Sequence, residues 1–215
     1  MDSDKTYYQN TYKNIYYKGI YGYFYSKPHK IMERSFNKNI HFDKVLELGA
    51  LDGEHRRFVQ HSYSKYYETD ILIEEKKSEE NLIRLKCDAN NLNNFKDAEF
   101  DRLLATCLVV HLTDVEHALS EWKRVVKKNG IISIWVHLEP SIFLRFIQYI
   151  FSRRLHNKNN IDWYEKIFKE HKTNYLRVNY YIKKVFKNSE IKKRYYPFRF
   201  LSWNFNLVAI YQIKV

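Results

Sequence analysis

Hydrophobic positions between residues 41 and 140 form short apolar runs that are separated by segments with helical spacing. The runs predict five buried strands, at residues 44–49, 65–71, 82–89, 100–107 and 130–140. Between them, a helix is expected from Glu54 to about His61, and a strongly amphipathic helix over 115–128 should end at Gly130. Strands that alternate with helices at this spacing indicate right-handed crossovers and a mostly parallel, doubly wound sheet.

The hydrophobic pattern changes after Pro140. Two apolar segments, 141–154 and 175–188, predict helices, and a basic, aromatic segment at 156–173 lies between them. The last two runs, at 190–198 and 205–215, are rich in aromatic and β-branched residues, and no long crossover separates them. We therefore expect an antiparallel hairpin at the end of the sheet. Ahead of the first strand, residues 29–38 predict a helix that follows Pro28.

Together these elements predict an α/β fold, with a doubly wound, Rossmann-like sheet of seven strands that is mostly parallel and ends in a C-terminal antiparallel β-hairpin. The 215 residues, 45% of them hydrophobic, suffice for one substantial core. No uncharged apolar run reaches the length of about 18 residues that a transmembrane helix needs, and the N-terminus lacks the apolar region of a signal peptide. Cys87 and Cys107 have no metal-ligand spacing. We expect a cytoplasmic protein without a metal site.

Charge is distributed unevenly along the chain. Residues 41–140 contain 14 Lys and Arg against 18 Asp and Glu, whereas residues 151–200 contain 14 against 4. Basic segments attract nucleic acid, anionic membranes or phosphorylated substrates through the same long-range field. A solvated basic face would have the same composition, so charge alone does not identify a partner.

Polar residues and glycines stand at the ends of four predicted parallel strands, which is where open parallel sheets bind their ligands. In chain order these are the turn with Gly49 and Gly53, then Asp70, Asp88, and Thr106 with Cys107. A carboxylate at the end of the second strand suits a ribose diol, and one at the end of the third suits an exocyclic amine. The glycines allow the backbone to approach such a ligand closely. Taken singly, each carboxylate could instead cap a helix or face solvent.

The segments VLELGALDG, ETDI, LKCDANNL and FDRLLATCLVVHLTDVEHALSEWKRVVKKNGIISI occur in this order, with 17 residues from Gly53 to Asp70 and 18 from Asp70 to Asp88. In these segments the chain resembles the class I S-adenosylmethionine-dependent methyltransferases of the small-molecule type often labelled methyltransferase domain 11. The resemblance covers roughly residues 41–137 and, more weakly, the final hairpin. It implies S-adenosylmethionine as the cofactor.

The resemblance also implies a single methyltransferase domain over residues 1–215. Its expected parts are an N-terminal helical cover (1–40), a cofactor-binding core (41–140), a helical, basic acceptor side (141–190) and the C-terminal hairpin (191–215).

Each matching residue acquires an implied role from this resemblance. Glu47 would orient the glycine turn and contact the amino group of the cofactor's methionine part, against a backbone wall formed by Gly49, Ala50 and Gly53. Thr106 and Cys107 would lie along the methionine part. Asp70 would accept hydrogen bonds from both ribose hydroxyls while Ile71 packs on the adenine. Asp88 would accept from the adenine amine, beside the backbone of Ala89.

Leu51 departs from the family pattern, in which this position usually holds glycine or another small residue. The G-x-G-x-x-G fingerprint of dehydrogenases, which brings phosphates to a helix N-terminus, is absent. A cofactor without a phosphate at this point tolerates a bulkier residue whose side chain points away. We therefore expect an ordinary backbone at Leu51, with its side chain directed off the cofactor. A weakened site in a non-catalytic relative is the alternative.

Methyl transfer from a sulfonium requires alignment of the nucleophile and, for a hydroxyl acceptor, a base. His111 follows the fourth strand, where the fold opens to the acceptor, and is the candidate base. His137 and His171 are less favoured candidates. The tyrosine-rich residues 5–25 are expected to cover the cofactor or, as an alternative, to pack against the edge of the sheet. The apolar helix at 141–154 could be an ordinary buried helix, cover the substrate, form a homodimer surface or contact a membrane.

Two functions remain open at this point. The first is methylation of a small molecule or saccharide. The acceptor could be a phosphorylated or lipid-linked glycan of polysaccharide biosynthesis, in which case the enzyme could lie at the inner face of the membrane. The second is an RNA methyltransferase or RNA-binding protein that uses the basic C-terminal segment. This second function is disfavoured because ATCLVV, rather than an Asn-Pro-Pro-Tyr type of motif, follows the fourth strand.

Overall fold

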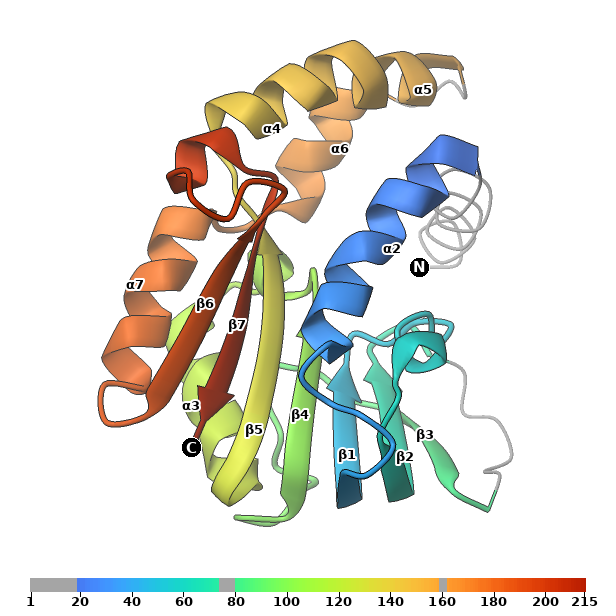
Figure 1. The fold of residues 1–215 in the computed structure, drawn as a ribbon, viewed down its shortest axis with the longest axis vertical. Helices are drawn as coiled ribbons and strands as arrows, with labels where there is room; N and C mark the ends of the chain where they lie inside the picture. Colours follow the sequence, from blue (N-terminus) through green and yellow to red (C-terminus); the bar gives the residue numbers. More distant parts are fainter. Residues whose placement is uncertain (1–18, 74–79, 159–161) are drawn as a thin grey trace.

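The computed structural model describes residues 19–73, 80–158 and 162–215 (Figure 1). Seven strands form one sheet in the order β3-β2-β1-β4-β5-β7-β6. The pairs formed among β1 to β5 are parallel, whereas β7 is antiparallel to both β5 and β6. The strands are β1 (His41–Leu48), β2 (Ser62–Asp70), β3 (Leu82–Lys86), β4 (Phe100–Thr106), β5 (Val126–His137), β6 (Glu190–Tyr196) and β7 (Val208–Lys214). The predicted fold class, including the antiparallel C-terminal hairpin, is confirmed.

Helices cover both faces of this sheet. The helices of the described ranges are α2 (Gly19–Glu33), α3 (Val115–Val125), α4 (Ile142–Ile147), the π-helical turn η4 (Gln148–Ser152), α5 (Arg153–Lys158), α6 (Trp163–Glu170) and α7 (Tyr175–Val185). Short 3-10 turns are η2 (Arg56–Phe58), η3 (Val109–His111) and η5 (Trp203–Phe205). Figure 1 shows α2 across one face, α3 and α7 on the other, and α4 to α6 beyond one end of the sheet. None of the helices in the described ranges is long and apolar enough to cross a membrane.

The amphipathic pattern of α3 is buried as the sequence predicts. Ala118, Leu119, Trp122 and Val125 are fully buried in a core cluster that also contains residues of α7 and of the central strands. The N-cap is Asp114, whose carboxylate accepts a hydrogen bond from the backbone N–H of His117 at 3.0 Å.

Two helix boundaries differ from the prediction. The helix at 115–128 ends at Val125, and Gly130 lies inside β5 instead of capping the helix. A Cβ atom at Gly130 would lie 2.9 Å from the backbone carbonyl of Asp101, so close backbone approach is what requires a glycine there. The helix expected to follow Pro28 begins at Gly19, with Pro28 inside it, and ends at Glu33.

The helix predicted from Glu54 to His61 is also wrong, because only the turn Arg56–Phe58 is helical there. The side chain of His55 is completely buried and hydrogen-bonded to Glu33 of α2, and Val59 is already extended. The tertiary contact of His55 therefore overrides the weak local preference of a short segment.

The contact between α2 and the sheet is a buried ion pair. Arg102 of β4 donates to both carboxylate oxygens of Glu33, at 2.8 and 2.6 Å, and its guanidinium lies 3.8 Å from the centre of the Phe36 ring. Both charged side chains are fully buried. Burial alone would raise the pKa of Glu33, but the charge of Arg102 and the hydrogen bonds from His55 and Arg102 lower it to about 2. The carboxylate is thus ionised and holds α2 in place.

Glu33→Gln is expected to destabilise the protein by about 3–5 kcal/mol, because it leaves the Arg102 charge buried without its counterion. Urea denaturation followed by circular dichroism measures this change. Glu165→Gln is the matched control, since Glu165 pairs with Lys169 on the surface of α6 and should change stability by about 1 kcal/mol or less. Equal stability losses in the two variants would contradict the structural role of Glu33.

Candidate active site

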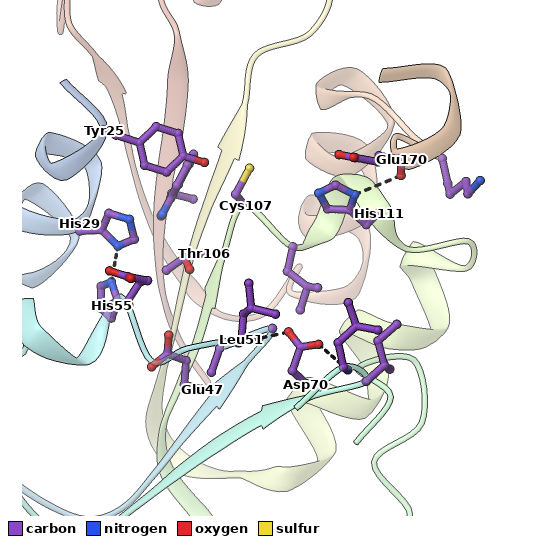
Figure 2. A pocket seen from close by; sticks show the side chains of 18 of the residues that line it. Tyr25, His29, Glu47, Leu51, His55, Asp70, Thr106, Cys107, His111 and Glu170 are labelled. Atoms are coloured by element: carbon purple, nitrogen blue, oxygen red, sulfur yellow. Dashed lines mark hydrogen bonds between the residues drawn. The ribbon is translucent and has the colours of Figure 1, made fainter. Parts of the chain in front are cut away.

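A cavity of about 330 Å³ lies at the carboxyl ends of β1, β2 and β4, beneath α2 (Figure 2). This volume is within the range of roughly 300–1,000 Å³ that small-molecule sites occupy. Eight residues that the sequence proposes for the site line it: Glu47, Gly49, Ala50, Asp70, Ile71, Thr106, Cys107 and His111. We call it the first cavity.

The glycine turn after β1 forms one wall of this cavity. Gly49 has a φ of 69°, and Leu51 has a φ of 46°, so both residues are in the left-handed region. The expectation of an ordinary backbone at Leu51 is therefore wrong, and Leu51 also lines the cavity. The physical reason is a hydrogen bond, because this conformation directs the Leu51 N–H to Oδ2 of Asp70 at 3.2 Å. The left-handed conformation costs a non-glycine residue roughly 1–2 kcal/mol.

The Asp70 carboxylate is held at the end of β2 by two backbone groups. Besides Leu51, the N–H of Leu72 donates to its Oδ1 atom at 2.8 Å. Burial raises the pKa of Asp70, and the backbone hydrogen bonds from Leu72 and Leu51 oppose this shift. Each carboxylate oxygen can accept more than one hydrogen bond. Asp70 is therefore a rigid acceptor, and the adjacent Ile71 has a side chain that is 57% exposed.

Gly53, Asp88 and Ala89 are not among the lining residues of the first cavity. Gly53 packs against Glu68, whose carboxylate a Cβ atom at this position would overlap. Ion pairs with Arg56 at 2.7 Å and Arg84 at 2.6 Å hold that carboxylate in place. The glycine is thus required by packing behind the turn.

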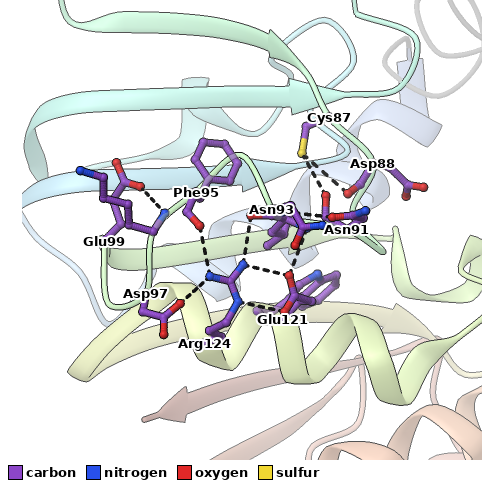
Figure 3. Close-up of polar contacts among 12 residues, drawn as sticks. Cys87, Asp88, Asn91, Asn93, Phe95, Asp97, Glu99, Glu121 and Arg124 are labelled. Atoms are coloured by element: carbon purple, nitrogen blue, oxygen red, sulfur yellow. Dashed lines mark hydrogen bonds and ion pairs between the residues drawn. The ribbon is translucent and has the colours of Figure 1, made fainter.

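Asp88 is exposed and its Oδ1 atom accepts from the backbone and side-chain amides of Asn90 at 2.8 and 2.9 Å. Ala89 is buried, and its carbonyl accepts from the indole of Trp122 at 2.8 Å. Figure 3 shows that Arg124 of α3 fixes the chain that follows, by contacts to Asp97, to Glu121 and to the carbonyl of Phe95.

Glu47 lies at the bottom of the first cavity and is only 1% exposed. The hydroxyl of Tyr66 donates to its Oε2 atom at 2.6 Å. Burial raises the pKa of Glu47 to about 8, and the hydrogen bond from Tyr66 only partly opposes the shift. At neutral pH this carboxyl group is therefore protonated.

A second cavity of about 160 Å³ adjoins the first. The two cavities share Tyr25, Cys107, His111, Trp135 and Glu170. The second one extends beneath α4 and α6, where its lining is mostly apolar, and includes His137, Glu139 and His171. The three histidines that the sequence proposes as candidate bases therefore line one space.

His111 stands at the boundary between the cavities. It ends the turn η3, and its Nδ1 atom donates to the backbone carbonyl of Glu170 at 3.1 Å (Figure 2). The backbone N–H groups of Lys172 and Thr173 in turn donate to the carbonyl of Val110, at 2.8 and 3.2 Å. A neutral imidazole that carries its proton on Nδ1 has its lone pair on Nε2. The chain thus fixes both the position and the tautomer of His111.

The other two histidines have different environments. Nδ1 of His171 donates to Oε2 of Glu139 at 2.6 Å, and Gln148 donates to the other oxygen at 2.9 Å. Burial alone would raise the pKa of Glu139, but the hydrogen bond and charge of His171 lower it to about 2. Burial lowers the pKa of His137 to about 4.

Sequence reasoning missed Trp135 and Glu139 as lining residues. The strand-end rule could have found both, because they stand at and just beyond the carboxyl end of β5. The hydrogen bond between His111 and the backbone carbonyl of Glu170 had no sequence signal, since every residue type has a backbone carbonyl. The predicted tyrosine-rich cover is described only from residue 19 onward, where Tyr25 lines both cavities; residues 1–18 lie outside the described ranges.

Comparison with known proteins agrees with this geometry. Residues 46–134 match the family model described as a methyltransferase domain. No curated protein sequence matches the chain. The matched segment spans the glycine turn and strands β1 to β5, and this match indicates an S-adenosylmethionine-dependent methyltransferase domain, with S-adenosylmethionine as the methyl donor.

Solved structures of similar fold are methyltransferases too. An S-adenosylmethionine-dependent methyltransferase from Thermotoga maritima has 17% identity and a TM-score of 0.59, with 97% of this chain and 94% of that chain covered. The N-methyltransferase NodS from Bradyrhizobium japonicum, in complex with S-adenosyl-L-homocysteine, has 10% identity and a TM-score of 0.57, with 89% and 87% covered. The CurJ carbon methyltransferase has 13% identity and a TM-score of 0.57; 86% of this chain is covered but only 53% of that one. At these identities the likeness shows the fold.

Proposed function

We propose that the chain transfers the methyl group of S-adenosylmethionine to a hydroxyl group of a small molecule or saccharide bound in the second cavity. The observation that carries this proposal is the position of His111, between a cavity at the cofactor end of the sheet and an adjoining, mostly apolar cavity. An apolar pocket with a few placed polar groups is typical of small-molecule sites.

The residues of the first cavity suit the cofactor. The carboxylate of Asp70 would accept hydrogen bonds from the ribose hydroxyls, and Ile71 would pack against the adenine. The backbone of Gly49 and Ala50 would lie along the cofactor. Thr106 and Cys107 would lie along the methionine part, whose ammonium group would face Glu47. Gly53 would support the turn from behind, and Asp88 with Ala89 would stand at the adenine end, outside the lining.

Bound S-adenosylmethionine supplies an electrophilic methyl group on a sulfonium. The chain's own residues align the acceptor and take up its proton. Nε2 of His111 would accept the proton of the acceptor hydroxyl, because Nδ1 is already committed to the carbonyl of Glu170. The carboxylate of Glu139 and the imidazole of His171 would hydrogen-bond other polar groups of the acceptor. The helices α4 and α6, which line the second cavity, would exclude water from it.

The division of the chain follows from these roles. We propose a single domain over residues 1–215, with 41–140 as the cofactor-binding core, 1–40 as its cover, 141–190 as the acceptor side and 191–215 as the closing hairpin.

Four lysines of the basic segment lie away from the cavities, which disfavours an RNA substrate bound through them. Lys183, Lys184, Lys192 and Lys193 are exposed near the connection from α7 to β6. β6 ends at Tyr196, which pairs with Val208 of β7 opposite His137, the carboxyl end of β5. The start of β6, where Lys192 lies, is therefore the end of this strand that is farther from the cavities. A nucleic acid bound there would not lead into the proposed site.

Asp70→Ala should weaken S-adenosylmethionine binding at least about 10-fold, because hydrogen bonds to a charged group contribute roughly 1.5–3 kcal/mol. Isothermal titration calorimetry measures the affinity, and circular dichroism verifies that the variant is folded. Asp43→Ala, which alters an exposed carboxylate near the start of β1, is the matched control and should have a much smaller effect. An unchanged affinity in Asp70→Ala would refute the cofactor assignment.

Cofactor binding should release a proton near pH 7. The Glu47 pKa of about 8 is raised above that of the unfolded chain, so its stabilising contribution is complete below about pH 4.5 and is lost as the pH rises through about 8. A cationic ammonium group beside the carboxyl would favour ionisation. Calorimetry in buffers of different ionisation enthalpy should detect the proton, and Glu47→Gln should abolish the difference. Equal apparent enthalpies in all buffers for the wild type would contradict the proposed contact.

His111→Ala should slow methyl transfer by about 10²–10⁴-fold while leaving the affinity for S-adenosylmethionine nearly unchanged, as expected for loss of a general base. Transfer of labelled methyl groups to fractionated cell extracts, with separate glycan and lipid fractions, measures the rate and identifies the acceptor class. His117→Ala, at an exposed position on α3, is the control. A parallel loss of cofactor affinity would assign His111 to cofactor binding instead.

A further inference from the structure

The helical layer above the second cavity has two apolar faces. Ile142, Phe146 and Tyr149 follow one another at helical spacing along α4 and η4, and their exposed fractions are 64%, 56% and 64%. On the inner side, Leu144 is only 5% exposed and lines the second cavity together with Ile147. A helix that is apolar on both sides normally has both sides covered. In the described part of the chain, the outer side is open.

Two neighbouring segments extend this open side. Phe198, in the connection from β6 to β7, lies with its ring centre 5.5 Å from that of Phe143, and Phe200 in the same connection is 99% exposed. The guanidinium of Arg153 lies 5.9 Å from the ring centre of Tyr149 and 5.6 Å from that of Tyr164 on α6. We call the resulting surface the aromatic face, formed by Ile142, Phe146, Tyr149, Tyr164, Phe168, Phe198, Phe200, Leu201 and Phe205.

The charges around the aromatic face have one sign along two of its three segments. Residues 141–154 and 197–205 contain Arg145, Arg153, Arg154 and Arg199 but no acidic residue, and all four arginines are exposed. The acidic exceptions belong to the third segment: Asp162 is the N-cap of α6, Glu165 is paired with Lys169, and Glu170 lines the two cavities. Exposed aromatic side chains among arginines are the pattern of segments that lie in the interface of an anionic membrane.

We propose that the aromatic face binds the surface of an anionic lipid bilayer and that the acceptor is an amphiphile taken from that bilayer. This rests on the proposed function of the second cavity, because α4, η4 and α6 line that cavity with their inner sides. An acceptor with an apolar anchor and a polar head would pass from the bilayer over this layer to His111. The second cavity combines apolar walls, which suit the apolar anchor, with the ionised Glu139, which suits the polar head.

A second copy of the chain is a poorer occupant of the aromatic face. Two-fold symmetric dimers place the same patch of each copy against itself, which would bring the four arginines toward their own counterparts. Like charges brought together at an interface oppose association. An anionic bilayer instead neutralises them.

Co-sedimentation of the full chain with vesicles tests the proposal. We expect binding to vesicles of phosphatidylcholine and phosphatidylglycerol, weaker binding at high salt, and little binding to phosphatidylcholine alone. The variant Phe146→Ser with Phe200→Ser should reduce binding at least about 10-fold through lost apolar insertion. Arg153→Gln with Arg199→Gln should reduce it by about 20-fold or more. Tyr180→Ser is the matched control, because Tyr180 is 60% exposed on α7 and should leave binding unchanged.

Each other outcome overturns the proposal. Absence of vesicle binding refutes it directly, and so does equal loss in the Tyr180→Ser variant. A concentration-dependent dimer in sedimentation velocity that Phe146→Ser with Phe200→Ser abolishes would assign the face to a second copy. Calorimetry with S-adenosylmethionine on the same variants separates this result from the proposed function. If cofactor binding and methyl transfer to a water-soluble acceptor persist without vesicle binding, only the membrane inference fails.

Discussion

The buried carboxylate of Glu33 joins three elements that together form the first cavity. It receives two hydrogen bonds from Arg102 on β4 and one from His55 in the loop after the glycine turn, while Glu33 itself ends α2. Because a carboxylate only accepts, His55 donates from Nε2 and, while neutral, can accept at Nδ1 from His29, 2.7 Å away. Burial lowers the pKa of both histidines, so this chain of contacts depends on their neutral forms. The carboxylate of Glu33 thus fixes α2, the loop that contains His55 and strand β4 relative to one another.

The sequence predicts the strand ends well because buried parallel strands are continuous apolar runs whose limits are visible. It cannot predict the Glu33–Arg102 pair, since 69 residues separate the partners and nothing local distinguishes them from surface charges. The error at Leu51 has a similar cause. Its left-handed backbone is stabilised by Asp70, on the next strand, and no rule based on residue type contains that contact. The prediction that Gly130 caps a helix is wrong because the sequence does not distinguish a glycine that ends a helix from one that another backbone segment approaches closely.

Two buried carboxyl groups at the site have opposite protonation states at neutral pH. Glu47 has only a neutral hydroxyl donor, from Tyr66, so desolvation raises its pKa to about 8. Glu139 has the imidazole of His171 and the amide of Gln148, and its pKa falls to about 2. The difference lies in the partners, because both groups are largely removed from water. A cationic ligand group would complete the surroundings of Glu47, whereas Glu139 already has its counterpart within the chain.

The helical layer over the second cavity connects this local chemistry to a larger surface. Packing could have buried the outer side of α4 under the β6–β7 connection, yet Phe200 is almost fully exposed there and Phe146 is more than half exposed. Large exposed apolar patches favour aggregation unless a partner covers them, so their persistence beside a cavity needs a reason. If this layer rests on a bilayer, the apolar surface that would otherwise be a liability becomes the route by which an amphiphilic acceptor reaches His111. The aromatic face then restricts the acceptor to molecules of the bilayer, because it positions the enzyme there. The second cavity beneath it needs to recognise only the polar head of the acceptor.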